Sequence, residues 1–530
     1  ARKEHVATSL LTRVRARLPG MTETGSQTSS AVTSKDVAKG AGTTLLARLG
    51  AVMEVIAQPI YVAMFGLAGY GLYAVLWAAV NLAENVADLG MTSSMQRVVP
   101  QARTPQEQVS ALRSAIVLGV GPCTVVAAVA SLAAAQFAPL FNAAESDSAR
   151  LVGIISLFAW SLPLWAFVEI ATSALRSKRV FGAEIRLRIF WEQVIRLAVT
   201  TGFWLAGFST MSLFYAHLIS LTIICLLCIR LLARHFDLRL FFKGRLFDPV
   251  FHETWKAGLA VLPANMVARL FGDGPSLVLN WLLPGSAGAV SGGLYAIARK
   301  ISSIVQVVRT AFAYVLAPLA SAASQNHVDE VRAIYGFATR VSLAIALPIG
   351  LVLAAAGRPI LGLFGSGAAM ALPAVVILVS ARVVETVLGA AVPIQQVTSS
   401  YWRQLLASIA GLGVAFAIGF VLMPEWGLTG MTIAVASGFI VAAALPMAQL
   451  YWHDRLHPFF KPFGRVLLRT TAFGAGGLVL TLLSHGLADW VQLPIAVGLM
   501  LAALWLSCRF ALPHDDRLSM GKTGRALRLT

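Results

Sequence analysis

The sequence predicts an all-α protein that crosses a membrane many times, and three observations lead to this prediction. Of its 530 residues, 57% are hydrophobic and only 12% are charged, whereas soluble proteins of this length carry about twice that charged fraction. Apolar runs long enough for a spanning helix recur from about residue 41 to about residue 512. These runs lack the alternation of β-strands, which leaves helices to satisfy the backbone in lipid.

The apolar runs divide into about fourteen expected membrane spans. They begin near residues 41, 68, 113, 151, 189, 211, 256, 292, 334, 369, 403, 427, 467 and 491. We therefore expect a multi-pass protein of the bacterial inner (plasma) membrane.

The basic residues indicate how the chain is oriented. A net charge of +18 would suggest a nucleic-acid partner in a soluble protein. Here Lys and Arg instead cluster in alternate loops, at 176–188, 230–245, 455–465 and 517–528. The positive-inside rule places these loops and both termini in the cytoplasm. We expect membrane lipids and no nucleic acid as partners.

The cysteines indicate no disulfide framework, metal site or cofactor. Cys225 and Cys228 form a C-x-x-C, but it lies inside an apolar run and has no second pair of ligands. Small apolar packing residues are the better interpretation. The sequence also has no Walker phosphate-binding loop, which argues against ATP as the power source.

An internal repeat divides the chain. Three short motifs recur in the same order about 220 residues later, each time at an equivalent place in the expected topology. They are Ala-Arg-Leu at 47–49 and 268–270, Gly-Leu-Tyr-Ala at 71–74 and 293–296, and Val-x-x-x-Arg at 109–113 and 328–332. The offset contains six spans, an even number, so the two copies enter the membrane in the same direction and form a parallel repeat.

The repeat predicts two six-helix lobes followed by two extra C-terminal helices. The expected divisions are a flexible cytoplasmic tail at 1–38, an N-lobe at 39–232, a basic cytoplasmic interlobe loop at 233–255, a C-lobe at 256–452, spans thirteen and fourteen at 453–512, and a cytoplasmic tail at 513–530.

Polar residues inside the spans follow helical spacing, so each set shares one helix face. A charge that faces lipid at mid-depth costs about 2.5–3.5 kcal/mol, and these faces must therefore point into protein or water. The stripes are Arg48, Glu54 and Gln58 in span one; Asn81, Glu84, Asn85 and Asp88 in span two; Asn265, Arg269 and Asp273 in span seven; and Arg299, Lys300, Gln306 and Arg309 in span eight.

Two arrangements explain such stripes: a hydrated cavity between the lobes, or buried salt bridges within the bundle. For spans two, seven and eight we favour the cavity, because uncharged polar residues continue the same faces. We assign Glu192 and Arg196 to a structural salt bridge, and Arg382 with Glu385 fits either arrangement. His217 is interpreted as a hydrogen-bonded packing residue.

The two lobes offer charges of opposite sign. The cations Arg48, Arg269, Arg299, Lys300 and Arg309 suit a phosphate or pyrophosphate group, because guanidinium binds phosphate oxygens in a bidentate fork. The carboxylates Glu84, Asp88 and Glu54 are candidates for a proton or cation site that couples to transport. Glu84 and Asp88 lie one turn apart, and their repulsion in a site with little water favours protonation of one of them.

Residues 39–99 resemble the O-antigen flippase type of polysaccharide exporter, within the multidrug/oligosaccharidyl-lipid/polysaccharide flippase superfamily. The motifs are a glycine that enters span one, Phe-Gly and then Gly-Leu-Tyr-Ala at span two, and Ala-Asp-Leu-Gly-Met-Thr-Ser before Arg97. The resemblance covers about residues 39–130 and 256–340.

The resemblance implies two six-helix lobes, alternating access, and transport of undecaprenyl-pyrophosphate-linked oligosaccharide to the periplasmic leaflet for surface polysaccharide synthesis. It also implies that cavity arginines meet the pyrophosphate, for which Arg48, Arg269, Arg299 and Arg309 are the candidates. Lipid-linked oligosaccharide and other polysaccharide-assembly proteins are the expected partners.

Three other functions remain open. A multidrug or cation antiporter of the same fold would need an acidic or aromatic cavity, and a lipid II flippase is a second alternative. A membrane glycosyltransferase, polymerase or ligase of the same pathway would need a large external loop, and the expected external loops are short. We therefore expect a transporter and not an enzyme.

The predicted topology can be tested by cysteine labelling. Residues 138–149 should be periplasmic and residues 176–188 cytoplasmic. An impermeant thiol reagent added to intact cells should therefore label a Ser146→Cys variant and leave a Ser177→Cys variant unlabelled. Labelling of both variants would contradict the assignment.

Overall fold

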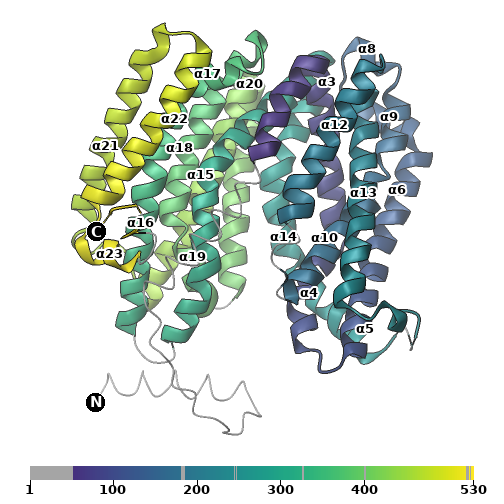
Figure 1. Cartoon of the computed structure of the whole chain (residues 1–530), viewed down its shortest axis with the longest axis horizontal. Helices are drawn as coiled ribbons and strands as arrows, with labels where there is room; N and C mark the ends of the chain where they lie inside the picture. The colour runs from purple at the N-terminus through teal and green to yellow at the C-terminus, as the bar shows by residue number, and fades with distance from the viewer. Residues whose placement is uncertain are drawn as a thin grey trace. The chain divides into compact units, whose positions relative to one another are not determined.

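The computed structural model describes residues 52–178, 180, 185–243, 245, 247–324, 328–398, 401–520, 524–525 and 527–529. Every regular element in these ranges is helical, which confirms the predicted all-α class. The helices before residue 249 are called the first half (Figure 1). They are α3 (Val52–Ala87), α4 (Met91–Gln101), α5 (Pro105–Ala115), η2 (Ile116–Val120), α6 (Gly121–Leu132), α7 (Ala134–Phe137), η3 (Ala138–Leu140), α8 (Glu145–Ser148), α9 (Leu151–Phe158), α10 (Ser161–Ser177), η4 (Ile185–Trp191), α12 (Glu192–Leu205), α13 (Met211–His235) and η5 (Leu238–Leu240).

The helices from residue 249 onward are called the second half. They are α14 (Pro249–Leu282), α15 (Ser286–Ser324), α16 (Val328–Ala355), α17 (Gly357–Gly362), η6 (Ser366–Ala371), α18 (Leu372–Leu388), α19 (Ala391–Thr398), α20 (Tyr401–Asp454), α21 (Phe463–Leu483), η7 (Ser484–Gly486), α22 (Asp489–Leu506), η8 (Ser507–Ala511) and α23 (His514–Ser519).

Two of the longest elements each contain a break at a glycine. A straight helix with the 54 residues of α20 would be about 80 Å long, far more than a bilayer. Gly427 breaks it with φ 48° and ψ −119°, a backbone conformation that glycine adopts without strain. A Cβ at Gly411 would lie 2.6 Å from the carbonyl oxygen of Gly438, so the two arms of α20 pack against each other. Gly66, with φ 71°, breaks α3 in the same way.

The described residues contain nine helices long and apolar enough to cross a membrane. Several are mostly exposed: only 22% of the apolar window in Trp402–Asp454 and 28% of that in Phe463–Gly486 is buried. Large apolar side chains cover these outer faces, including Phe416 and Leu483, which are 76% and 75% exposed. Soluble proteins rarely expose so much apolar surface. The chain is therefore a multi-pass membrane protein.

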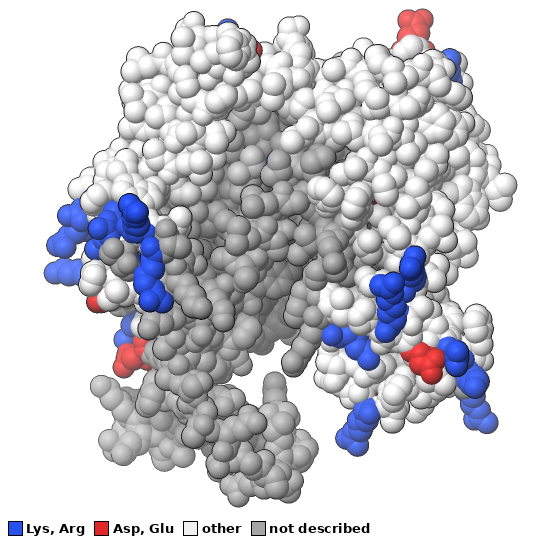
Figure 2. Space-filling view, in the orientation of Figure 1, with Lys and Arg blue, Asp and Glu red and all other residues white. Residues whose placement is uncertain are grey.

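Charged residues gather at one end of the helices. Figure 2 shows Lys and Arg mainly toward the end that carries α5 and α23, and few charges near α8 at the opposite end. Glu145 and Asp147 lie in α8. The visible face therefore has the asymmetric charge that the alternation of basic loops predicts.

One apolar core joins the two halves. It includes Leu72 of α3 and Phe214 of α13 together with Tyr295 of α15 and Leu378 of α18. Within it, α3 packs against both α14 and α15. A second core, within the first half apart from Ala257 of α14, contains Met91 of α4 and Ile170 of α10. The packing of α3 places its polar residues close to both halves.

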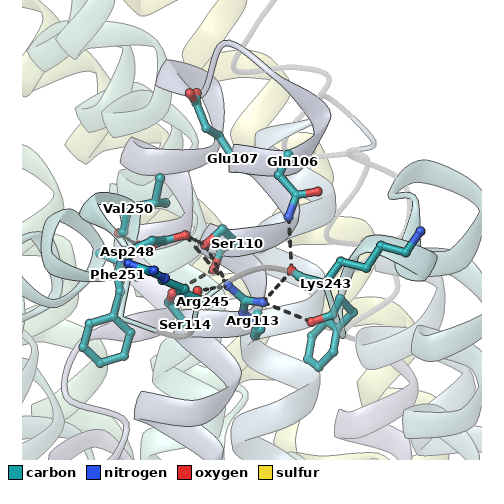
Figure 3. A network of polar contacts seen from close by, with 12 residues as sticks. Gln106, Glu107, Ser110, Arg113, Ser114, Lys243, Arg245, Asp248, Val250 and Phe251 are labelled. Atoms are coloured by element: carbon teal, nitrogen blue, oxygen red, sulfur yellow. Dashed lines mark hydrogen bonds and ion pairs between the residues drawn. The ribbon is translucent and has the colours of Figure 1, made fainter.

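A buried arginine fixes the segment that connects the halves (Figure 3). Arg113 of α5 is 7% exposed. Its guanidinium donates to three backbone carbonyls of the connecting segment, those of Phe241 (3.3 Å), Lys243 (2.9 Å) and Arg245 (2.5 Å). Charge-assisted bonds of this kind are stronger than neutral ones. The connecting segment is therefore held against α5.

Asp248 continues this attachment to the start of α14. Its Oδ1 accepts the backbone N–H of Phe251 at 2.8 Å and so caps the helix N-terminus, while its Oδ2 accepts a hydrogen bond from Ser110 of α5. Arg113 lies 3.8 Å from the same carboxylate. The second half therefore begins at a point that is fastened to the first.

An Arg113→Ala variant tests this attachment. The change removes the donor for three carbonyls, and we expect it to lower the free energy of unfolding by about 3 kcal/mol. Arg103→Ala is the matched control, because Arg103 is an exposed arginine shortly before α5. Thermal unfolding of the purified proteins in detergent should show a loss for Arg113→Ala alone. Equal unfolding temperatures for the two variants would contradict the structural role.

Candidate functional site

A cavity of about 510 Å³ lies between α3 and α12 of the first half and α14, α15, α18, α19 and α20 of the second half. Aromatic side chains from α3, among them Tyr73 and Trp77, form part of its wall. The polar residues of the wall are Gln58, Gln193, Arg196, Arg299, Lys300, Ser303, Gln306, Arg309, Arg382, Glu385, Gln404 and Ser408.

Helix α15 supplies much of the cationic surface. Arg299, Ser303 and Gln306 follow each other at intervals of four and three residues, which places them on one face of a helix. Lys300 and Arg309 flank that face and also line the cavity. The structure thus brings together four of the residues that the sequence singled out in span eight.

A buried aspartate forms an ion pair with Arg299. Oδ1 of Asp273, on α14, lies 3.0 Å from the guanidinium of Arg299. The aspartate side chain is 3% exposed and that of the arginine 34%. Arg299 therefore has one side on a buried carboxylate and another toward the cavity, while Asp273 itself lies behind the wall. The pairing offsets the cost of placing the arginine within a membrane helix.

Arg309 is paired in a similar way, with a carboxylate on α18. Its guanidinium lies 3.4 Å from Glu385, and that carboxylate also accepts a 2.6 Å bond from Arg382. Arg382 stacks over Phe439 at 3.8 Å and is 5% exposed. The sequence left Arg382 and Glu385 open between a salt bridge and a cavity role; in the structure they form the bridge and also line the cavity.

Arg196 lines the cavity although sequence reasoning assigned it to a salt bridge alone. The ion pair with Glu192 is present at 3.5 Å. The guanidinium also donates to the hydroxyl of Tyr73 at 2.7 Å and lies 2.8 Å from Nδ1 of His217, which is fully buried. Gln193 completes the group and also lines the cavity. The signal in the sequence was the polar face of span five, where Gln193 and Arg196 are three residues apart.

The polar stripe of span two is buried and is not part of the described cavity wall. Asn81, Glu84 and Asp88 are 5%, 3% and 4% exposed, and they are absent from the described lining of the cavity, as is Asn85. Oδ2 of Asp88 accepts the backbone N–H of Thr92 at 3.1 Å. Oδ1 faces η2, where a Cβ at Gly119 would lie only 2.7 Å away.

Glu84 and Asp88 form no ion pair with any described residue. The neighbouring arginines pair instead with Glu169 of α10, which sequence reasoning missed. Arg188 lies 2.9 Å and Arg269 3.9 Å from the Glu169 carboxylate. Glu84 is close enough to Glu169 and Asp88 to be repelled by both.

Arg269 connects the two halves behind the cavity wall. Besides Glu169 it pairs with Asp273, one turn along α14, at 3.9 Å. One turn before it, Nδ2 of Asn265 donates to the hydroxyl of Ser93 on α4 at 3.2 Å. Neither Arg269 nor Asn265 is among the described residues of the cavity wall.

Two further predicted residues cannot be placed on the cavity. Arg48 lies outside the described residues, and so does the side chain of Glu54.

The cavity suits an anion. Among the described residues of its wall, five carry a cationic side chain and one, Glu385, carries a carboxylate. Low-dielectric surroundings strengthen the attraction of these cations for a negative group. Guanidinium groups present several N–H donors in a planar fork, which fits phosphate oxygens.

The comparisons with known proteins identify a family for the chain. The family described as "Polysaccharide biosynthesis protein" matches residues 64–368, more than half of the chain. A comparison with curated proteins finds no match.

Solved structures share the fold. The lipid II flippase MurJ, in an inward closed conformation, is 11% identical with a TM-score of 0.65, over 86% of this chain and 96% of that one. The Vibrio cholerae MATE transporter VcmN is 16% identical with a TM-score of 0.59, over 79% of this chain and 98% of that one. An inward-facing multidrug resistance MATE family transporter of the MOP superfamily has a TM-score of 0.58 at 16% identity, over 79% and 94%.

Proposed function

The chain belongs to the polysaccharide biosynthesis protein family, and on this premise we propose that it is a flippase for undecaprenyl-pyrophosphate-linked oligosaccharide. It moves this lipid from the cytoplasmic to the periplasmic leaflet of the bacterial inner membrane by alternating access. The product serves the synthesis of surface polysaccharide such as O-antigen or exopolysaccharide.

The observation that carries the proposal is the charge of the cavity. Among the described residues of its wall there are five cationic side chains and one carboxylate, and this excess of cations favours a pyrophosphate over an organic cation. Asp273 and Glu385 hold Arg299 and Arg309 while leaving about a third of each arginine side chain exposed. The substrate's phosphates bind these exposed donors, and its lipid tail remains in the bilayer.

The finer architecture is part of the proposal. Fourteen spans form two parallel six-helix lobes, 39–232 and 256–452, with a basic cytoplasmic loop between them, two further spans at 453–512 and both termini in the cytoplasm. The repeat of Gly-Leu-Tyr-Ala and the basic loops support this arrangement. The lipid-linked oligosaccharide, membrane lipids and other polysaccharide-assembly proteins are its partners.

We further propose that Glu84 and Asp88 couple proton movement to transport. Both are buried and form no ion pair with a described residue, while the charged groups that act on Glu84 are Glu169, Asp88, Arg269 and Arg188. An ionised carboxylate buried without a partner costs several kcal/mol. A proton removes this cost, and its release would draw Glu84 toward the arginines that Glu169 now binds.

Replacing the cavity arginines tests the substrate site. Arg299→Ala and Arg309→Ala should each reduce export of surface polysaccharide, since one lost charge-assisted contact is worth about 1.5–3 kcal/mol, roughly ten- to a hundredfold in affinity. Complementation of a deletion strain measures the export. Arg358→Ala, which removes an exposed arginine of α17 that is not among the described residues of the cavity wall, is the control. Full complementation by both cavity variants, at normal protein levels, would contradict the site.

Replacing Glu84 by glutamine tests the coupling. Glu84→Gln should block transport of lipid-linked sugar in proteoliposomes but leave the protein folded, because the amide mimics the protonated state. The exposed Glu425 provides the control variant Glu425→Gln. The wild type should transport faster with a pH gradient than without one. Transport that ignores the gradient, or a Glu84→Gln protein that is active or unfolded, would rule out the proton role.

A further inference from the structure

Asn142 and Asn280 join the two halves by exchanging hydrogen bonds. Asn142 lies between η3 and α8, and Asn280 in the last turn of α14. The backbone N–H of Asn142 donates to Oδ1 of Asn280 at 3.0 Å, and Nδ2 of Asn280 donates to the carbonyl oxygen of Asn142 at 2.8 Å. Nδ2 of Asn142 in turn donates to the carbonyl oxygen of Asn280 at 2.7 Å. That carbonyl is among the last four of the helix, which have no partner within it.

Helices α3 and α15 touch next to this pair. A Cβ at Gly71 would lie 2.0 Å from the carbonyl oxygen of Ala289, and a Cβ at Gly293 would lie 2.7 Å from Cα of Gly71. Real Cβ atoms do not approach other atoms so closely, so neither position accepts a side chain in this arrangement. Gly71 and Gly293 each begin a Gly-Leu-Tyr-Ala motif. The repeated motif therefore brings equivalent helices of the two repeats into backbone contact.

The contact lies at one end of the cavity. Tyr70 and Tyr73, on either side of Gly71, line the cavity, and so does Ala296, one turn after Gly293. From there the wall continues along α15 as far as Arg309. The glycine contact and the asparagine pair therefore lie at the end of the cavity that is nearer to the start of α8.

We propose that Asn142, Asn280 and the Gly71–Gly293 contact form the gate that must separate for the cavity to open toward the side of residues 138–149. This inference rests on the proposed alternating access. In this proposal the repeated Gly-Leu-Tyr-Ala motif serves the closing and opening of the gate.

The chemistry of the contact suits a gate. The hydrogen bonds between the two asparagines are between neutral groups, and each such bond contributes little net free energy because water replaces it on opening. Glycine and amide groups leave no buried charge unpaired when the helices separate. By contrast, separating Arg113 from its carbonyls would strand a buried guanidinium, so that attachment is suited to stay closed.

Cysteine accessibility tests the gate. The probe is an Ala296→Cys variant, whose thiol would lie on the cavity wall beside the contact; the four native cysteines are buried. Asn142→Ala, Asn280→Ala and Gly71→Ala are each added to it. Gln136→Ala, an exposed residue at the same end, and Gly202→Ala, where a Cβ meets nothing within 4 Å, are the controls. An impermeant maleimide is applied to intact cells and to inside-out vesicles.

We expect each gate variant to label roughly tenfold faster than the probe protein from the side that labels Ser146→Cys, and no faster from the other side. The controls should label like the probe protein. If Gly71→Ala fails to accumulate, the asparagine variants decide the result. Unchanged labelling in these variants, or equal increases from both sides, would overturn the gate.

The assay reads the opening of the cavity and needs no substrate. If the gate variants show altered accessibility while the cavity-arginine variants export polysaccharide normally, the gate is supported and the proposed substrate is rejected. If the gate variants show unaltered accessibility while the cavity-arginine variants lose export, the gate is rejected and the substrate site is supported.

Discussion

The cost of placing charge inside a bilayer governs how this protein is built. An arginine or aspartate that faces lipid at the centre of the membrane is expensive, yet the chain places many of them within its spans. The structure keeps them by pairing arginines with nearly buried carboxylates: Arg299 with Asp273, and Arg309 with Glu385. Each pair leaves part of the guanidinium exposed. The interaction that offsets the cost of the charge within the membrane therefore also leaves donors for the proposed substrate.

The pairing of charges is uneven, and the proposed function explains this imbalance. Among the described residues of the cavity wall the cations outnumber the carboxylates, whereas the carboxylates Glu84 and Asp88 lie apart from that wall without ion pairs to described residues. An anionic substrate would offset the first excess and a proton the second. Glu169 acts electrostatically on Glu84 and pairs with both Arg188 and Arg269. In the proposed cycle, a change at the carboxylates reaches α14 through Arg269 and then Arg299 through Asp273.

How much the sequence predicts depends on the residue. Helical spacing identified Arg299 and Gln306 as one face of α15, and the hydropathy pattern identified the all-α membrane class. The same spacing grouped Glu84 with Asp88, but periodicity shows which residues share a face and not what that face meets. The sequence favoured the cavity for this stripe, whereas the structure buries it away from the described cavity wall. Glu169 was missed because it is the lone carboxylate of its span, and Asn142 because loops have no periodicity to read.

The central claim is that the protein moves a pyrophosphate-linked sugar lipid across a bilayer. The most direct measurement reconstitutes the purified protein into liposomes with radiolabelled undecaprenyl-pyrophosphate-linked oligosaccharide in the inner leaflet. An impermeant glycosidase outside then reports the sugar that reaches the outer leaflet. The account predicts faster exposure than in protein-free liposomes, unaffected by an excess of ethidium. Exposure no faster than without protein, or transport of ethidium in its place, would contradict it.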